Sequence, residues 1–516
     1  MTPQPMPRQP MPRQPMPRQP MPRQSSPLAS EPMRTPYSTP RPPCAAMVLT
    51  VRVRTWLAAG VLALALAGCG EPPPAVVIAE PGAIPPAAQR PGDPQVGRQA
   101  LLNRAVVTCG LPVSAYVAST GAPAPAYELP GREGRNAELP YQLTAHTTDG
   151  GVELVTSNCL GCHAAPLNGE LVIGLGNEFL DFTRDPVMAV EAAGAYVEGE
   201  AETAAWRDWA DRIAAIAPWT MTDTVGANPA QAITLALMAH RDPKTLAWSD
   251  EPLMDPPPTE VLPVSVPPWW NLKKKHAVFY NGQGRGDHVG TMILASTTCT
   301  DSVDEAREID RWFTDVAAYL ATLEAPAYPW PIDPGLAADG ERVFNRECKE
   351  CHGRYGAGEH YPNKLVGLDE VGTDPAMAEA AVDDAKDYIR WFETSFYGRH
   401  GDAVPGRGYV APPLDGVWAT APYLHNGAVP TIAALLDSSK RPTYWRHDGA
   451  EPDYDPAALG WRYRTLDRGR EQFASLDAQK WVYDTTRRGY GNQGHNFGDE
   501  LSPPERTALL EYLKTI

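Results

Sequence analysis

Two pentapeptides have the residue types and the spacing of a covalent haem site: Cys159-Leu-Gly-Cys162-His163 and Cys348-Lys-Glu-Cys351-His352. In a Cys-x-x-Cys-His pentapeptide the two thiols lie about one helical turn apart. They can therefore form thioethers with both vinyl groups of one haem while the histidine ligates its iron. A lone Cys-x-x-Cys also occurs in zinc half-sites and thioredoxin-like redox pairs, but neither needs a histidine directly after the second cysteine. The sequence thus predicts two covalently bound haem c groups, with His163 and His352 as iron ligands.

The residues before each pentapeptide are also alike. Gly151 and Gly340 each stand eight residues before the first cysteine, and apolar pairs follow at 154/155 and 343/344. Similar stretches at matching positions indicate an internal repeat. We expect one helix to lead into each haem.

Length and composition favour an irregular, mainly α protein. The chain has 516 residues, with 56 prolines and 43 glycines, which suits two or three domains joined by long loops. We predict a mainly α fold with two cytochrome-c-like haem domains, long irregular loops and few short strands. The formal net charge of −17 argues against binding to nucleic acid or to anionic lipid surfaces. It would suit a basic redox partner, although acidity is also common in exported proteins.

The N-terminal region reads as a low-complexity stretch followed by an export signal. Residues 1–46 repeat Pro-Arg-Gln-Pro-Met and have too little apolar content for a core, so we expect a disordered extension, or one that is not translated. In residues 47–69 a basic start precedes the apolar run Trp56–Leu66, and Leu66-Ala-Gly-Cys69 has the form of a lipobox. An ordinary cleaved signal peptide or a short anchor are the alternatives. We predict an exported lipoprotein, periplasmic or anchored in the outer membrane, that touches the membrane only through lipid on Cys69.

The remaining chain divides at a proline-rich stretch. Residues 70–139 read as a tether and an N-terminal loop-rich segment, and 140–329 as cytochrome c domain 1. Four prolines in 325–334 forbid a helix and mark the boundary to domain 2, residues 330–516. Apolar periodicity predicts helices at 96–106, 187–196, 201–216, 229–238, 304–323, 336–348, 377–396 and 503–513.

Two cysteines remain after haem and lipid attachment. Cys44 precedes the expected start, so Cys109 and Cys299 are left over. In an oxidising compartment two such thiols are more often a disulfide than reactive centres. We therefore predict a Cys109–Cys299 bridge.

Several longer motifs resemble a known group of proteins. The segment Ala411-Pro-Pro-Leu-Asp-Gly-Val-Trp418, followed by Thr420-Ala-Pro-Tyr-Leu-His425-Asn-Gly-Ala-Val-Pro-Thr431, resembles bacterial di-haem cytochrome c peroxidases. Three further stretches narrow the resemblance to their rubber-oxygenase-like branch: Pro267-Pro-Trp-Trp-Asn-Leu-Lys-Lys-Lys275, Phe279-Tyr-Asn-Gly282 and Asn492-Gln-Gly-His-Asn-Phe-Gly498. The resemblance covers roughly residue 141 to the C-terminus.

The resemblance implies different roles for the two haems. It points to His495 as the distal ligand of the haem on Cys348 and Cys351, with His425 and Met377 as alternatives of suitable ligand type. It also implies that the haem on Cys159 and Cys162 is the reactive one, with Trp269 and Trp270 near its distal face or between the haems. The alternative for this tryptophan pair is a purely structural place in the core.

A glycine-containing loop supplies candidate acid–base groups. Residues 282–288 read Gly-Gln-Gly-Arg-Gly-Asp-His, but no strand-to-helix context supports a dinucleotide loop. Arg285 and His288 are the residue types that a peroxidase needs to move a proton and to stabilise developing charge. Alternatively, Arg285 pairs with a haem propionate.

Two classes of function follow. The first is an oxidoreductase that performs O2 or peroxide chemistry at haem 1 and electron transfer at haem 2, either as a di-haem peroxidase or as a rubber-oxygenase-like dioxygenase. Its partners would be a small electron-donor protein or an apolar substrate. The second is a non-enzymatic electron-transfer cytochrome in which both haems are six-coordinate.

Overall fold

Helices contribute more residues than strands in the part of the chain that the computed structural model describes, residues 76–447 and 453–516. All of these residues belong to one compact unit, Pro73–Ile516, and the expected boundary at 329/330 falls inside it. The predicted extension 1–46, the leader 47–69 with Cys69, and the start of the tether lie outside the described residues. In the described ranges, no helix combines the length and the apolar character that crossing a bilayer requires.

Three of the longer helices begin within two residues of their expected starts, each at an Asp-Pro pair. The expected helix 377–396 is instead two helices, Ala376–Asp383 and Lys386–Thr394. Asp93, Asp185 and Asp333 each cap a helix whose first residue is proline. The α-helices are α1 (Pro94–Asn103), α2 (Val113–Thr120), α3 (Leu160–His163), α4 (Pro186–Gly194), α5 (Glu200–Ile216), α6 (Ala230–Ala239), α7 (His288–Met292), α8 (Val303–Leu320), α9 (Pro334–Glu347), α10 (Lys349–His352), α11 (Leu368–Val371), α12 (Ala376–Asp383), α13 (Lys386–Thr394), α14 (Ile432–Leu435), α15 (Leu476–Gln479) and α16 (Pro503–Leu513).

The strands are two to five residues long and pair antiparallel. They form three-stranded sheets in the orders β1-β8-β10, β2-β4-β3 and β14-β11-β15, together with the ribbons β5-β6, β7-β9 and β12-β13. Their bounds are β1 (Gly82–Ala83), β2 (Leu111–Pro112), β3 (Leu143–Thr147), β4 (Glu153–Ser157), β5 (Ala164–Leu167), β6 (Glu170–Ile173), β7 (Gly284–Gly286), β8 (Lys364–Gly367), β9 (Gly401–Ala403), β10 (Gly408–Val410), β11 (Tyr444–His447), β12 (Tyr454–Asp455), β13 (Gly460–Trp461), β14 (Tyr463–Leu466) and β15 (Val482–Asp484).

The expectation of one helix leading into each haem is correct for the second pentapeptide and wrong for the first. Helix α9 runs directly into Cys348, whereas the residues before Cys159 form strand β4. Pairing on both sides decides the difference: β4 is the central strand between β2 and β3, and Leu154, Val155 and Thr156 are all buried there. Two adjacent apolar residues occur in strands as well as in helices, so the pair 154/155 alone could not distinguish a strand from a helix.

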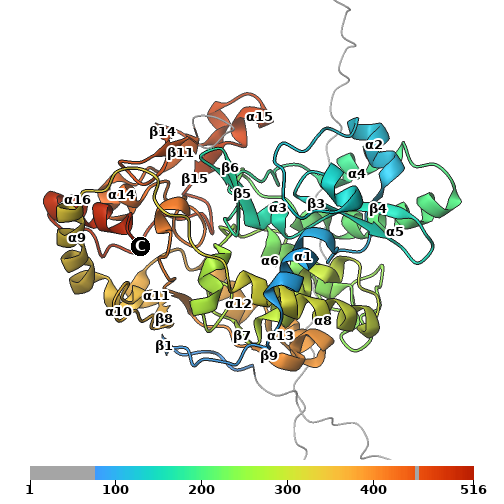
Figure 1. Ribbon diagram of the computed structural model, residues 1–516, viewed down its shortest axis with the longest axis horizontal. Coiled ribbons are helices and arrows are strands. Elements are labelled where there is room, and N and C mark those ends of the chain that lie inside the picture. Colours follow the sequence, from blue (N-terminus) through green and yellow to red (C-terminus); the bar gives the residue numbers. More distant parts are fainter. Residues whose placement is uncertain (1–75, 448–452) are drawn as a thin grey trace, which may run out of the picture. The chain divides into compact units, whose positions relative to one another are not determined.

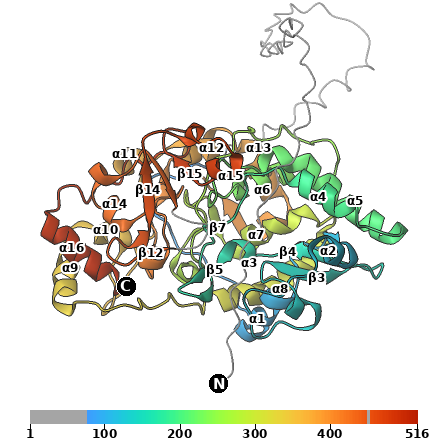
Figure 2. The ribbon, with the colours of Figure 1, turned by 90° about the horizontal axis from the view of Figure 1, so that it is seen from above.

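A pair of crossing helices closes each half of the chain. Helix α1 packs against α8, and α9 against α16, and each pair lies side by side in Figures 1 and 2. At both crossings a glycine permits close backbone contact: a Cβ on Gly97 would lie 1.9 Å from the Asp315 carbonyl oxygen, and one on Gly340 would lie 1.9 Å from that of Ala508. The two halves therefore share the same kind of close helix–helix packing as well as the Cys-x-x-Cys-His motif. Helix α1 comes from the segment 70–139 that was predicted as tether and loops, in which a helix at 96–106 was expected.

Two main hydrophobic cores meet at the adjacent tryptophans of the short 3-10 helix Trp269–Lys274. Trp269 belongs to the core that contains Leu160 and helix α8, and Trp270 to the core that contains Phe344, Trp418 and helix α16. Both indoles are almost fully buried, at 4% and 1% exposure. This short helix therefore joins the surroundings of the first pentapeptide to those of the second.

Candidate haem sites

The first pentapeptide forms a one-turn helix held by the loop that follows it. Cys159 stands at the N-terminus of α3, and the amide of His163 donates to the Cys159 carbonyl over 3.0 Å. Downstream, the Gly174 amide donates to the His163 carbonyl and the Asn177 amide to that of Cys162, over 2.8 and 2.9 Å. Residues 174–177 thus hold the backbone of Cys162 and His163 in place.

The second pentapeptide borders a cavity of about 380 Å³. Cys348 ends α9 and starts α10, and the amide of His352 donates to the Cys348 carbonyl over 3.0 Å. The cavity is lined by the pentapeptide together with apolar residues of the second core, among them Phe344, Leu435, Leu509 and Leu513. A mainly apolar cavity beside two half-buried thiols is the environment that a covalently attached haem needs.

His495 lies opposite His352 across this cavity. The centres of the two imidazole rings are 6.1 Å apart. Metal–imidazole bonds are about 2.0–2.1 Å long and a ring nitrogen lies about 1.1 Å from the ring centre, so two imidazoles on opposite sides of one metal have centres about 6.3 Å apart. The observed separation therefore fits a bis-histidine iron.

Both rings are held in place and kept neutral. The Pro412 carbonyl is 2.9 Å from Nδ1 of His352, which leaves the other ring nitrogen for a metal. His495 has a left-handed backbone with φ of 48°, and its amide donates to the Val371 carbonyl over 2.6 Å. Burial, reinforced by His352, lowers the pKa of His495 to about 3, and burial also lowers that of His352. Neutral imidazole is the form that binds metals.

His163 has a different neighbour. Its ring stacks on the indole of Trp269, with ring centres 4.4 Å apart and planes 17° from parallel. Burial lowers the pKa of His163 to about 4. The Pro267 carbonyl lies close enough to oppose this shift, although it does not reach hydrogen-bond geometry with Nδ1. Among the ring contacts of the described residues, the partner of His163 is therefore an indole, whereas that of His352 is an imidazole.

The loop beside each motif histidine is duplicated in the fold. Residues 267–284 and 412–429 share the same turns at an offset of 145 positions, the separation between Trp270 and Asp415. Phe279 and Leu424 are both left-handed, with φ of 67° and 70°, and each is followed three residues later by a left-handed glycine. The bridges Val278–Gly284 and Tyr423–Val429 close the two hairpins in the same way.

The duplicated loops also touch at equivalent positions. The indole N–H of Trp270 donates to the Asp415 carbonyl over 2.8 Å. Tyr280 and His425 occupy matching places at the hairpin tips, with ring centres 6.4 Å apart. The two loops thus pack together about an approximate local twofold, and their prolines, Pro267 and Pro412, face the two motif histidines.

The alternative ligands do not lie opposite His352. His425 is buried in the same cavity lining, but its ring stacks on Tyr409 with centres 4.0 Å apart. Burial lowers the pKa of His425 to about 3. Met377 is packed in a separate apolar cluster with Ala378 and Tyr409. Of the three candidates, His495 is the one whose ring faces the motif histidine.

Arg285 and His288 lie on two short elements, β7 and α7, and Val289, which follows His288, belongs to the same hydrophobic core as Leu160 of the first pentapeptide. Arg285 belongs to β7 and donates from Nε to the Gly282 carbonyl, while its Nη2 is buried without a partner. His288 opens α7, and burial lowers its pKa to about 4. In the described part of the chain neither side chain forms a hydrogen bond or ring contact with Cys159, Cys162 or His163. Asp287, between them in the loop, pairs with Arg90 at 3.0 Å.

The sequence assigned no role to Glu178, Tyr280 or Tyr409, although Tyr280 lies in the stretch 279–282 that contributes to the family resemblance. All three are buried polar groups around the cavity and the first pentapeptide. The repeated Pro-Pro and Asn-Gly pairs at 267/412 and 281/426 would have revealed the duplicated loop, and with it the equivalence of Tyr280 and His425. Glu178 stands in an ordinary loop sequence, and only its surroundings distinguish it.

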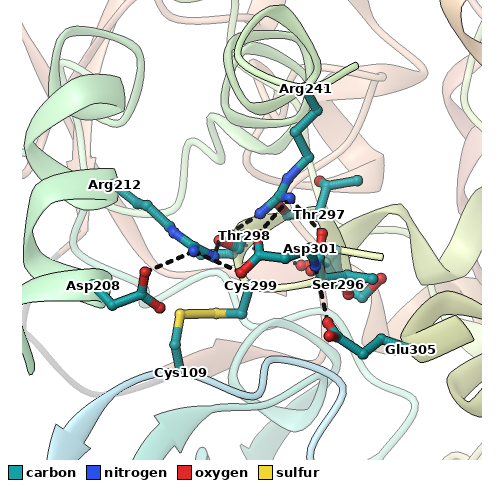
Figure 3. The surroundings of a disulfide bond; sticks show 12 residues. Cys109, Asp208, Arg212, Arg241, Ser296, Thr297, Thr298, Cys299, Asp301 and Glu305 are labelled. Atoms are coloured by element: carbon teal, nitrogen blue, oxygen red, sulfur yellow. Dashed lines mark hydrogen bonds and ion pairs between the residues drawn. A yellow bond between two sulfur atoms is a disulfide. The ribbon is translucent and has the colours of Figure 1, made fainter. Parts of the chain in front are cut away.

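Cys109 and Cys299 are joined by a disulfide, with Cα atoms 5.5 Å apart (Figure 3). Two arginines pack beside it. Arg212 pairs with Asp208 and Asp301 at 2.7 and 2.8 Å, and the fully buried Arg241 pairs with Asp301 at 2.9 Å. The bridge ties the segment before β2 to the end of the 3-10 turn that precedes α8.

We expect the Cys109→Ala/Cys299→Ala double variant to lose about 2–5 kcal/mol of free energy of unfolding, because the bridge restricts the unfolded chain over a long loop. The two residues are separated by 190 positions. Denaturant unfolding followed by circular dichroism measures the loss. Reduction of the wild-type protein should reproduce the decrease and should leave the variant unchanged. If alkylation of the folded, oxidised wild type labelled both cysteines, the bridge would be refuted.

Comparison with known proteins gives a family match in the second half of the chain. Residues 408–446 match the family model described as RoxA-like, cytochrome c-like. The matched residues contain Pro412, His425 and the second of the duplicated loops. A cytochrome c-like segment of this kind implies covalently bound haem c and a haem cytochrome with a possible role as an oxidoreductase.

Two proteins of Sinorhizobium fredii (strain NBRC 101917 / NGR234) are similar to this chain. The uncharacterized protein y4iJ is 30% identical over 292 residues, which cover 43% of this chain and 47% of y4iJ. The uncharacterized protein y4iM is 29% identical over 253 residues, covering 41% of this chain and 56% of y4iM. The chain thus spans about half the length of these curated relatives.

Proposed function

We propose that this protein is an exported di-haem c-type oxidoreductase, in which O2 or peroxide reacts at the haem on Cys159 and Cys162 while the haem on Cys348 and Cys351 transfers electrons. The observation that carries the proposal is the difference between the two motif histidines. The ring of His352 has a second imidazole, that of His495, at 6.1 Å, whereas the ring of His163 is stacked on the face of the Trp269 indole and has no second imidazole among its ring contacts in the described residues. A haem with two axial protein ligands is suited to electron transfer, whereas one with a free position binds small molecules.

The side chains around the first pentapeptide suit this division. Trp269 is almost fully buried, so it can hold the His163 ring in one orientation and keep water from that side. Trp270 lies in the second core and is hydrogen-bonded to the Asp415 carbonyl. The tryptophan pair would thus connect the two haem environments. Arg285 and His288 remain the candidates for proton movement at haem 1.

Other parts of the proposal have support of different kinds. The α1/α8 and α9/α16 pairs and the duplicated loops support two cytochrome-c-like domains. The Cys109–Cys299 bridge supports export to an oxidising compartment. Lipid attachment at Cys69, a basic electron-donor protein and an apolar substrate are proposed from the sequence alone.

The experiment that tests the proposal is electron paramagnetic resonance of the purified ferric protein. We expect one low-spin and one high-spin haem, with the high-spin signal altered by peroxide. Oxygen uptake with a polyisoprene suspension, compared with peroxide turnover with a reduced donor, then separates an oxygenase from a peroxidase. Two low-spin haems that peroxide leaves unchanged would overturn the proposal in favour of an electron-transfer cytochrome.

A further inference from the structure

Glu178 is a buried carboxyl group without a cationic partner. It lies in the loop between β6 and α4 and is 5% exposed. Its Oε1 accepts hydrogen bonds from the Ser265 hydroxyl over 2.9 Å and from the Val266 amide over 3.2 Å. None of the ion pairs found within residues 76–447 and 453–516 includes it. A charged carboxylate in such a place is costly unless a positive group compensates it, and a neutral one is not.

This carboxyl lies between the first pentapeptide and the cavity of the second. On one side, the neighbouring Asn177 is hydrogen-bonded to the Cys162 carbonyl, and the charge of Glu178 acts on the Cys162 thiol. On the other side, its hydrogen-bond partner Ser265 lines the cavity that contains His352 and His495, and so does Tyr280, on which the Glu178 charge also acts. A change of charge at Glu178 would therefore be felt at both sites.

The other titratable groups near Glu178 keep one charge state near neutral pH. They are Cys162 on α3, Tyr280 in the loop 267–284, and Tyr483 on β15. Cys162 does not titrate once it is a thioether. Burial raises the pKa of both tyrosines above the ordinary value, so both stay neutral. Burial raises the pKa of Glu178 itself to about 8, and its two hydrogen bonds oppose this only in part. Glu178 is therefore the group that changes charge close to neutral pH.

We infer that Glu178 takes up a proton when the haem on Cys159 and Cys162 is reduced. The inference rests on the proposed function in requiring haem at that pentapeptide. A one-electron donor reduces ferric to ferrous iron, the Glu178 carboxylate accepts one proton from water, and the total charge of the site is unchanged. The Ser265 hydroxyl and the Val266 amide position the carboxyl group. Coupling of this kind keeps an electron in a buried site from leaving an uncompensated negative charge.

The test is a potentiometric titration of both haems between pH 5 and pH 10. In the wild type, the midpoint potential of the first haem should fall as the pH rises. The fall should be confined to the pH window between two values, the pKa of Glu178 with ferric iron and the higher pKa of Glu178 with ferrous iron. The sign follows because the carboxylate stabilises the more positive ferric state. A coupling of one proton per electron corresponds to about 59 mV for each tenfold change in proton concentration. Glu178→Gln should abolish this slope.

Three further variants make the result specific. Glu170→Gln changes an exposed carboxyl group nearby on β6 and should keep the wild-type slope. Glu178→Asp retains a carboxyl group and should retain a slope. Ser265→Ala removes one hydrogen bond to the carboxylate, so it should move the window to higher pH, and it also serves if Glu178→Gln does not fold. Equal slopes in Glu178→Gln and wild type, with both haems attached, would overturn the inference. A protein with no haem on the first pentapeptide would instead refute the proposed function.

Discussion

The Cys348→Ala/Cys351→Ala double variant is expected to carry one covalent haem where the wild type carries two. Both thiols border the cavity, and without them no thioether can form at this pentapeptide. The haem content by pyridine haemochrome assay and the intact mass of the protein measure the loss. Because His352 and His495 would lose their shared iron, the low-spin signal should disappear as well.

Two other variants bracket this result. Lys349→Ala/Glu350→Ala changes the two residues between the cysteines, both of which have exposed side chains, and should keep both haems. Cys159→Ala/Cys162→Ala should remove the other haem and leave the low-spin signal in place. If the Cys348/Cys351 variant still contained two covalent haems, attachment at this pentapeptide would be excluded.

The second large effect is expected for His495→Ala. Removal of this imidazole takes away the ring that faces His352 at 6.1 Å, so the iron of the second haem should change from six-coordinate low-spin to high-spin. Electron paramagnetic resonance and the visible spectrum of the ferric protein measure the change. An added soluble imidazole should restore the low-spin signal, which loss of folding would not allow.

His425→Ala is the matched control for this variant. Both histidines line the same cavity and both are kept neutral by burial, but the ring of His425 stacks on Tyr409. We expect His425→Ala to keep the low-spin signal. The reverse outcome, with His495→Ala silent and His425→Ala high-spin, would assign the distal position to His425.

Local sequence was sufficient for features that depend on neighbouring residues. The longer helices were predictable because their apolar periodicity and their Asp-Pro N-termini are contained in a few turns. The same holds for the two haem-binding pentapeptides, since the geometry of Cys-x-x-Cys-His is that of a single helical turn. The left-over cysteines predicted the pairing of Cys109 with Cys299 by elimination.

Tertiary structure decided everything that depends on distant segments. The strand before Cys159 exists because β2 and β3 pair with it on both sides, which an apolar pair of residues does not reveal. His495 and His352 meet because the end of the chain returns to α10. The pKa of Glu178 is raised because long-range packing buries its carboxyl group, against the opposing effect of the hydrogen bonds from Ser265 and Val266, and nothing in its own loop marks it. The sequence by itself determined where haem can be attached. Long-range packing decided which ring lies next to each motif histidine. The reason is that the neighbouring ring comes from a segment distant in the sequence, so its position depends on how the chain packs and not on residue spacing.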